Sequence, residues 1–242
     1  MKILILGGTS EARALAARLV ALGHEVTTSL AGRTSSPLLP DGELRVGKFG
    51  GVPGLAGYLT RMGFDRLVDA THPYAGLISI NAVAASHQSA IPLVRLMRPA
   101  WEEPAGAGWL HARDVTAAAG LLPRFATVLL TSGHEGLGTL LSRGDCSFLV
   151  RLIEPPETPL PRHARLLLAR PPYTVEDEVR LLRGETITHL VSKNSGGSQT
   201  AAKLEAAREA GVQVIMIDRP AYGPAREVAS VDEAVAALAA TA

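Results

Sequence analysis

Short apolar runs alternate with helical patterns over the first hundred residues. The chain opens on an apolar run at 2–6, passes through a Gly-Gly-Thr-Ser turn, and continues with a helical pattern over 11–22 that ends at Gly23. A short apolar run bounded by turn signals predicts a buried strand, and a glycine after a periodic stretch predicts a helix end. The same signs place further strands at 25–30, 43–49, 66–70 and 92–97, and helices at 52–62 and 76–89. This alternation predicts parallel βαβ units.

A second region of the same kind follows a stretch without periodicity at 102–108, which is rich in Pro, Gly, Ala and Glu. Such composition is typical of a linker, so we expect domains at 1–103 and 104–242. In the second domain strands are expected at 127–131, 148–153, 164–169, 189–192 and 214–217, and helices at 115–122, 137–142, 174–183, 200–210 and 231–240. The predicted fold is α/β, with two Rossmann-like parallel-sheet domains facing each other across a cleft. Ligands bind at the carboxyl ends of the strands in such sheets.

Composition narrows the functional classes. The 242 residues are 47% hydrophobic and 19% charged, which is typical of an ordered globular protein. A formal net charge of +1 argues against nucleic acid as a partner. The single cysteine, Cys146, excludes an intramolecular disulfide and a multi-cysteine metal site, and the scattered histidines suggest no metal. No apolar stretch reaches the length of a signal or transmembrane segment, so a cytoplasmic location without a membrane partner is expected.

The first turn, Gly7-Gly8-Thr9-Ser10-Glu11, stands where a strand hands over to a helix. Glycines allow close backbone approach there, and free amides at a helix start attract phosphate. The turn departs from Gly-x-Gly-x-x-Gly, because Thr9 occupies the second glycine position. A dinucleotide-binding turn is the favoured interpretation; a plain tight turn with Ser10 as N-cap is the alternative.

The end of the second predicted strand indicates which dinucleotide binds. An NAD site would offer an acidic residue to the ribose there, whereas this chain has Ser29 and Arg33 in a stretch without Asp or Glu. These side chains suit a 2′-phosphate, so NADPH is the expected cofactor. Gly50 and Gly51, after the third strand, would let the backbone pass close to the adenine or ribose, although a simple turn also explains them.

A polar segment, Asp-Ala-Thr-His-Pro-Tyr-Ala at 69–75, follows the fourth predicted strand. Thr71 and His72 are expected to contact the nicotinamide, and His72 and Tyr74 are the candidate catalytic residues. His72 as a simple helix cap is the alternative.

Four motifs carry a family resemblance: Ile-Leu-Gly-Gly-Thr-Ser-Glu-Ala at 5–12, the segment at 69–75, Arg-Pro-Ala-Trp at 98–101, and Ser-Lys-Asn-Ser-Gly-Gly at 192–197. In order and spacing they resemble the precorrin-6A reductase family of cobalamin biosynthesis, over essentially the whole chain. The resemblance implies hydride transfer from NADPH to one double bond of the precorrin-6A macrocycle, which gives precorrin-6B. It implies neither a metal nor a covalent nucleophile.

A tetrapyrrole with many carboxylates needs cationic and hydrogen-bond-donating partners. Arg98 and Lys193 are the first candidates, because each follows a predicted strand. Trp101 is expected either to stack on the macrocycle or to anchor the domain junction. The remaining candidates lie in turns or after strands of the second half and are Ser132, Gly133, His134, Asn194, Ser195 and Arg219. Neighbouring enzymes of the pathway are possible partners through substrate channelling.

Other functions are less consistent with the residues. An S-adenosylmethionine methyltransferase would usually place an acidic residue after the second strand, and a short-chain dehydrogenase needs a Tyr-x-x-x-Lys pair that none of the four tyrosines forms. An NADH-dependent reductase of cobalt-containing precorrin-6A and a non-catalytic dinucleotide-binding protein remain open. The sequence determines neither the proton donor, nor the face of hydride delivery, nor the oligomeric state.

Overall fold

The computed structural model describes residues 1–32 and 38–240 and divides the chain into two compact units. Unit 1 comprises Met1–Pro99 and Pro220–Ala242, and unit 2 comprises Ala100–Arg219. The expected boundary after residue 103 therefore lies four residues too late, and the expectation that 104–242 forms one domain needs correction. Pro220–Ala242 belongs to unit 1, because its strand and helix complete the sheet and core of that unit.

Unit 1 contains one parallel sheet with the strand order β12-β5-β4-β1-β2-β3. Its strands are β1 (Lys2–Leu6), β2 (Glu25–Leu30), β3 (Glu43–Val46), β4 (Arg66–Asp69), β5 (Leu93–Leu96) and β12 (Arg226–Val228). Its helices are α1 (Ser10–Ala21), α2 (Gly51–Met62), α3 (Gly76–Ser89) and α8 (Val231–Ala239). The expected strands and helices of this region are confirmed, with ends that differ by at most three residues.

Unit 2 repeats this design with the strand order β6-β11-β10-β7-β8-β9, again all parallel. Its strands are β6 (Leu110–Ala112), β7 (Thr127–Leu130), β8 (Ser147–Leu152), β9 (Ala164–Leu168), β10 (His189–Lys193) and β11 (Gln213–Ile217). Its helices are α4 (Val115–Leu121), α5 (Leu137–Leu141), α6 (Val175–Gly184) and α7 (Ala202–Ala210). The predicted α/β class with two Rossmann-like parallel sheets is confirmed.

The edge strands β6 and β12 were missed by the sequence pattern. Each has only three residues, which is too short for a hydrophobic period to show. β12 pairs with β5, although the whole of unit 2 separates them along the chain. Conversely, β6 is the first strand of unit 2 in sequence and pairs with β11, the last strand of that unit.

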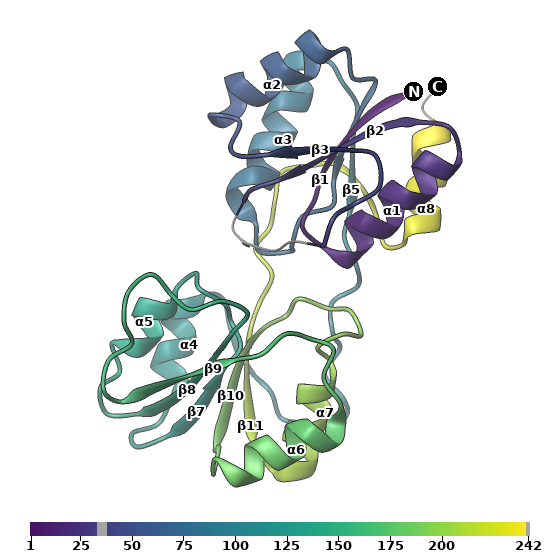
Figure 1. Cartoon of the computed structure of the whole chain (residues 1–242). Helices are drawn as coiled ribbons and strands as arrows, with labels where there is room; N and C mark the ends of the chain where they lie inside the picture. The colour runs from purple at the N-terminus through teal and green to yellow at the C-terminus, as the bar shows by residue number, and fades with distance from the viewer. Residues whose placement is uncertain (33–37, 241–242) are drawn as a thin grey trace. The chain divides into compact units, whose positions relative to one another are not determined.

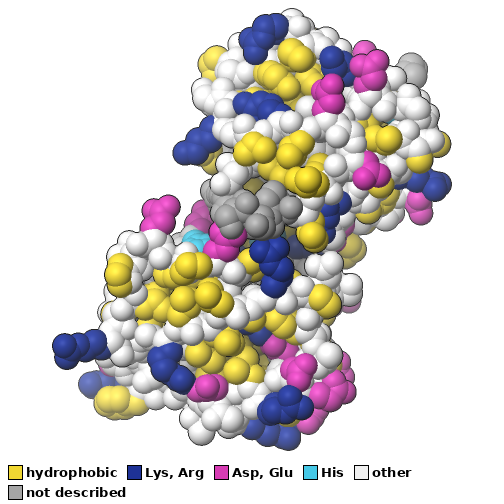
Figure 2. Space-filling view, viewed as in Figure 1, with side chains coloured by type: hydrophobic (Ala, Val, Ile, Leu, Met, Phe, Trp, Pro, Cys, Tyr) yellow, Lys and Arg dark blue, Asp and Glu magenta, His cyan; other side chains and the backbone are white. Residues whose placement is uncertain are grey.

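Both faces of the first sheet are covered by helices (Figure 1). Alternation along β1 sends Ile3 and Ile5 into a core with α1 and α8, and Leu4 and Leu6 into a core with α2 and α3. This is the two-sided burial that a parallel sheet requires. Within the described residues, no helix combines the length and hydropathy needed to cross a membrane. Acidic and basic side chains are interspersed on the face shown in Figure 2.

The order of each sheet reverses at one place, where neighbouring strands connect in opposite directions along the sheet. In unit 1 this switch point lies between β1 and β4, and in unit 2 it lies between β7 and β10. Loops that leave the carboxyl ends at a switch point diverge to opposite faces, so open α/β sheets bind ligands there. The motifs at 7–11, 69–75, 131–135 and 192–197 follow these four strands.

We expect Leu238→Ala, on α8, to lower the stability of unit 1 by about 2–5 kcal/mol, because the side chain is 1% exposed in the core beside β5 and α1. Both tryptophans, Trp101 and Trp109, lie in unit 2. The midpoint of urea unfolding measured by far-UV circular dichroism, which reports on both units, should therefore shift more than the midpoint measured by tryptophan fluorescence, which reports on unit 2. Leu77→Ala, at a side chain that is 77% exposed, is the matched control. An unchanged circular dichroism transition in Leu238→Ala would contradict the assignment of 220–242 to unit 1.

Candidate functional site

The turn after β1 is built on two glycines with different constraints. The Gly7 amide donates a hydrogen bond to the Ser29 carbonyl (2.9 Å), and a Cβ on Gly7 would lie 2.7 Å from the Thr28 methyl carbon. Gly8 has a φ of +113°, a conformation that favours glycine. The backbone can therefore turn closely beside β2 and enter α1 with its first amides directed outward.

Thr9, rather than Ser10, is the N-cap of α1. Its hydroxyl accepts a hydrogen bond from the Ala12 amide (3.1 Å) and donates one to the Ala70 carbonyl (2.8 Å). The side chain is buried, and both hydrogen-bonding roles are used inside the protein. Thr9 thus connects the turn after β1 to the residue that follows β4, across the switch point.

Glu11 and Arg98 form an ion pair at the start of α1. The Arg98 guanidinium lies 2.8 Å from a Glu11 carboxylate oxygen, and the Ser10 hydroxyl donates to the same oxygen (3.1 Å). Burial alone would raise the pKa of Glu11, but the charge of Arg98 and hydrogen bonds to the carboxylate lower the pKa overall. Arg98, expected on the substrate, therefore has a partner in the expected coenzyme turn. The pair neutralises the carboxylate that would otherwise repel an anion there.

The ends of β2 and β3 come together beside this turn. Ser29 is buried at the end of β2, and its hydroxyl accepts a hydrogen bond from Arg45 (3.2 Å), which lies opposite it on β3. Gly50 and Gly51 have φ values of +82° and +86° where α2 begins. Arg33 lies outside the described residues. Arg45 was missed because sequence reasoning considered only the segment that directly follows the second strand.

The end of β4 is fixed by a buried carboxylate. Asp69 accepts hydrogen bonds from the amide (3.2 Å) and hydroxyl (2.7 Å) of Thr71, and its other oxygen lies 3.4 Å from Arg95. Arg95, which is 1% exposed, also pairs with Glu227 of β12 (2.8 Å). Thr71 is therefore held by a network that runs from β4 through β5 to β12.

His72 and Tyr74 lie together in the loop between β4 and α3. The Tyr74 amide donates to Nδ1 of His72 (3.3 Å), and the ring centroids are 5.9 Å apart. His72 is exposed and Tyr74 is half-buried. Because Nδ1 accepts a hydrogen bond, the neutral imidazole carries its proton on Nε2. The Tyr222 hydroxyl, which sequence reasoning missed, donates to the Pro73 carbonyl in the same loop.

In unit 2, a buried cation and a buried hydroxyl flank the switch point. Lys193 ends β10 and is 8% exposed, with Nζ 3.6 Å from the carboxylate of the exposed Glu135. The Ser132 hydroxyl, after β7, is buried without a hydrogen-bond partner among the described residues. Gly133 has a φ of +77° and His134 follows it. A buried donor and a buried cation next to each other favour an anionic or carbonyl-bearing ligand.

Trp101, Asn194 and Arg219 form a junction where the chain enters and leaves unit 2. The Asn194 side chain accepts from the Trp101 amide (2.8 Å) and donates to the Trp101 carbonyl (3.0 Å). Arg219 donates to the Asn194 carbonyl (2.7 Å), and the Trp101 indole donates to the Gly197 carbonyl (2.9 Å). The backbone and the indole of Trp101 are thus both hydrogen-bonded within unit 2, and its two expected roles stay predictions. The Ser195 amide donates to the Lys193 carbonyl (2.7 Å) and closes the turn.

Comparison with known proteins decides the family. The family model for precorrin-6x reductase CbiJ/CobK matches residues 2–239. The chain belongs to this family. The resemblance inferred from the four motifs is therefore confirmed, and membership in a reductase family identifies the chain as an oxidoreductase.

Individual relatives of this reductase family match over nearly the full length. The precorrin-6A reductase of Rhodococcus erythropolis is 49% identical over 98% of this chain and 96% of its own length. That of Rhodobacter capsulatus is 46% identical over 97% of this chain and 94% of its own length. The cobalt-precorrin-6A reductase of Priestia megaterium is 28% identical over 98% of this chain and 97% of its own length. A solved structure of CobK precorrin-6A reductase matches with a TM-score of 0.93 at 44% identity, covering 99% of this chain and 96% of the other.

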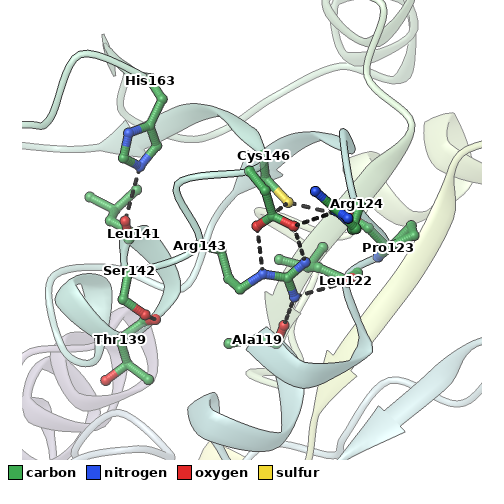
Figure 3. Close-up of polar contacts among 11 residues, drawn as sticks. Ala119, Leu122, Pro123, Arg124, Thr139, Leu141, Ser142, Arg143, Cys146 and His163 are labelled. Carbon is green, nitrogen blue, oxygen red and sulfur yellow. Dashed lines mark hydrogen bonds and ion pairs between the residues drawn. The ribbon is translucent and has the colours of Figure 1, made fainter.

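The single cysteine of this family member lies in a structural cluster (Figure 3). Cys146 is buried, its thiol donates to the Pro123 carbonyl (3.4 Å), and burial raises its pKa. Arg143 binds the Asp145 carboxylate through two bonds (2.8 and 3.0 Å) and also donates to carbonyls at the end of α4. Among the described residues, no group of three or more His, Cys, Asp or Glu side chains is arranged to hold a metal ion.

We expect Glu11→Gln to weaken the dependence of folding stability on pH in the acidic range. The pKa of Glu11 is lowered in the folded protein, so its contribution is present above the usual value of 4.5 and is lost as the pH falls through the folded value. Urea midpoints between about pH 3 and 7 measure this slope. Arg98→Gln removes the same ion pair and should flatten the profile in the same way. A slope identical to that of the unchanged protein in both variants would show that the pair contributes nothing.

Proposed function

We propose that this chain catalyses the NADPH-dependent reduction of a double bond in the precorrin-6A macrocycle, giving precorrin-6B, a step of cobalamin biosynthesis. The observation that carries the proposal is the glycine turn after β1, placed at the switch point of the first sheet in a chain of this reductase family. A cytoplasmic location and transfer of the product to neighbouring pathway enzymes stay predictions.

The turn after β1 fits the pyrophosphate of a dinucleotide. The start of α1 offers main-chain amides that have no partner within the helix, and the helix dipole favours an anion there. A side chain at position 7 would meet Thr28, so only glycine leaves room for this tight turn. The charge of Glu11 is compensated by Arg98 at 2.8 Å. Gly7, Gly8, Thr9, Ser10 and Glu11 are the residues that would hold the pyrophosphate.

The NADP form fits the end of β2 better than the NAD form. Ser29 ends this strand region, and the next Asp or Glu in the sequence is Asp41. An NAD site needs a carboxylate for the ribose hydroxyls, and such a carboxylate would repel a 2′-phosphate. Gly50 and Gly51 stand at the start of α2, where the absence of side chains would permit close approach of the adenosine. Arg33 remains a proposed phosphate ligand from the sequence.

Reduction of a carbon–carbon double bond requires a hydride and a proton. When bound, the reduced nicotinamide supplies the hydride. We assign the proton to the loop after β4, where Thr71 and His72 would contact the nicotinamide. The Tyr74 amide bond to Nδ1 leaves Nε2–H of His72 as the donor. Tyr74, whose ring packs 5.9 Å from the imidazole, is the second candidate donor.

The carboxylates of the tetrapyrrole fit the cationic switch point of unit 2. Lys193 offers a buried ammonium, and the Ser132 hydroxyl and the turn at Gly133 and His134 lie at the neighbouring strand end. A charge-assisted hydrogen bond in such a place is stronger than one in water. Asn194 and Ser195 follow Lys193 directly, and Trp101 and Arg219 bind Asn194. We propose that these four residues shape the substrate site.

Metal-free precorrin-6A is favoured over its cobalt complex. Identity to the precorrin-6A reductases of Rhodococcus erythropolis and Rhodobacter capsulatus is 49% and 46%, whereas identity to the cobalt-precorrin-6A reductase of Priestia megaterium is 28%. We therefore propose that this chain acts on metal-free precorrin-6A, as the names of its more similar relatives indicate for those proteins.

A direct assay tests the reaction. Anaerobic incubation of the protein with NADPH and precorrin-6A, with and without cobalt in the ring, should show substrate-dependent loss of nicotinamide absorbance, faster for the metal-free ring and slower with NADH. Binding of NADPH without substrate-dependent oxidation would leave a non-catalytic dinucleotide-binding protein as the answer.

Lys193→Gln should raise the KM for precorrin-6A about tenfold or more, because a charge-assisted contact to a substrate carboxylate is lost. The Kd for NADPH should stay within about twofold, since Lys193 belongs to unit 2 and the proposed coenzyme turn to unit 1. Arg124→Gln, a cation of unit 2 that is 76% exposed before β7, is the control and should change neither value. A fall in NADPH affinity alone for Lys193→Gln would refute the assigned role.

A further inference from the structure

Arg45 occupies the carboxyl end of β3, directly opposite Ser29 of β2 in the strand register. Its Nη1 donates to the Ser29 hydroxyl (3.2 Å) and to the Gly47 carbonyl (2.6 Å), and its Nη2 donates to the Lys48 carbonyl (2.9 Å). These bonds hold the guanidinium at the end of β2. Among the described residues, Nε–H and the second N–H of Nη2 have no hydrogen-bond acceptor.

An aromatic ring fixes the plane of this guanidinium. The central carbon of Arg45 lies 3.7 Å from the Phe49 ring centroid and 5.2 Å from that of Tyr58. The two rings also pack on each other at 5.4 Å. A guanidinium stacked on one ring face and bonded along one edge has its orientation set before a ligand arrives, so it loses little freedom on binding.

The charge of Arg45 has no counter-charge in the described part of the chain. Its hydrogen-bond partners in the described residues are a hydroxyl and two carbonyls, and no carboxylate of residues 1–32 or 38–240 lies within ion-pair distance of it. The nearest acidic residue on the same strand, Glu43, accepts a hydrogen bond from Thr27 instead. A half-buried cation held by neutral groups at a strand end is arranged for an incoming anion.

We infer that Arg45 binds the 2′-phosphate of the coenzyme and thereby sets the preference for NADPH over NADH. The inference rests on the proposed function, because it requires the dinucleotide to lie with its pyrophosphate at the turn after β1. In that pose the adenosine ribose reaches the end of β2, where Arg45 holds the Ser29 hydroxyl. Ser29 and Arg45 then act as a pair, the hydroxyl beside the ribose and the guanidinium on the phosphate.

The competing explanation is that Arg45 only closes the backbone at Gly47 and Lys48. Three variants separate the two roles. Arg45→Gln removes the charge and keeps a hydrogen-bonding side chain, whereas Arg45→Lys keeps the charge and loses the planar fork. Arg61→Gln removes an exposed guanidinium from the last turn of α2 and is the matched control.

The measurement is the Kd of each protein for NADPH, NADH, adenosine 2′,5′-bisphosphate and adenosine 5′-monophosphate, with thermal melting as a check on folding. Arg45→Gln should weaken NADPH and the bisphosphate about 10-fold to 100-fold and change NADH and the monophosphate by less than about twofold. Arg45→Lys should fall between Arg45→Gln and the unchanged protein. The preference for the 2′-phosphate should also decrease with ionic strength in the unchanged protein and less so in Arg45→Gln.

Equal weakening of all four ligands, or an NADPH preference that survives in both Arg45 variants, would overturn the assignment. If the unchanged protein prefers NADH, the role of Arg45 falls while a reductase remains. If the unchanged protein binds neither coenzyme, the proposed function falls together with it. If the melting temperature drops for Arg45→Gln but not for Arg45→Lys, the lysine variant decides the question. An NADPH preference in Arg45→Lys as strong as that of the unchanged protein would then contradict the inference.

Discussion

Two hydrogen bonds of the Thr9 hydroxyl are the interactions on which the arrangement of the first switch point depends. It donates to the Ala70 carbonyl and accepts from the Ala12 amide, and so joins the end of β4 to the start of α1. Parallel strands on either side of a switch point send their loops apart. The Ala70 amide still donates to the Leu6 carbonyl (3.0 Å), and the Thr9 hydroxyl extends this connection from the strands to the loops that follow them. Unit 2 has a comparable contact, since the Thr131 amide and hydroxyl both donate to the Val191 carbonyl (3.0 and 3.1 Å). In both units, a threonine after the first strand of the switch point donates to a carbonyl of the neighbouring strand region, just after β4 in unit 1 and within β10 in unit 2.

Charge is distributed in a consistent way around these strand ends. Glu11 is paired with Arg98, and Asp69 with Arg95, so the carboxylates near the first switch point are compensated. Within the described residues, the partners of Arg45 are a hydroxyl and two carbonyls, and Lys193 is buried with its ammonium 3.6 Å from the carboxylate of a mostly exposed glutamate. The chain as a whole carries a net charge of only +1, so these two cations are local features of the strand ends. A coenzyme with several phosphates and a substrate with several carboxylates would be attracted to such positions.

Much of the fold could be predicted because the relevant signals are local. Apolar runs and helical periods located the long strands and helices, and the glycines of the first turn predicted the passage from strand to helix there. The edge strands β6 and β12 have only three residues each, which is too short for a local pattern. The position of β12 also depends on pairing with β5, which lies far from it in the sequence. The domain boundaries were wrong at 103 and at 220 for the same reason, since a linker can be recognised by composition but a return to the first sheet cannot.

Side-chain partners were the least predictable part of the site. Residue types suggested that Arg98 would bind the substrate, but its partner Glu11 is 87 positions away and becomes its neighbour only through the sheet order. Ser10 and Thr9 are equally good N-caps by composition, and the carbonyl of Ala70 favours Thr9. Arg45 lies on β3, an edge strand of the sheet, and only the register of β2 with β3 shows that it reaches Ser29.

The most direct test of the central claim is a crystal structure of the protein with NADPH. Pyrophosphate oxygens should lie within hydrogen-bonding distance of main-chain amides between Gly8 and Glu11. Binding of the pyrophosphate at a turn of unit 2, such as 195–198, with the turn after β1 empty, would contradict it.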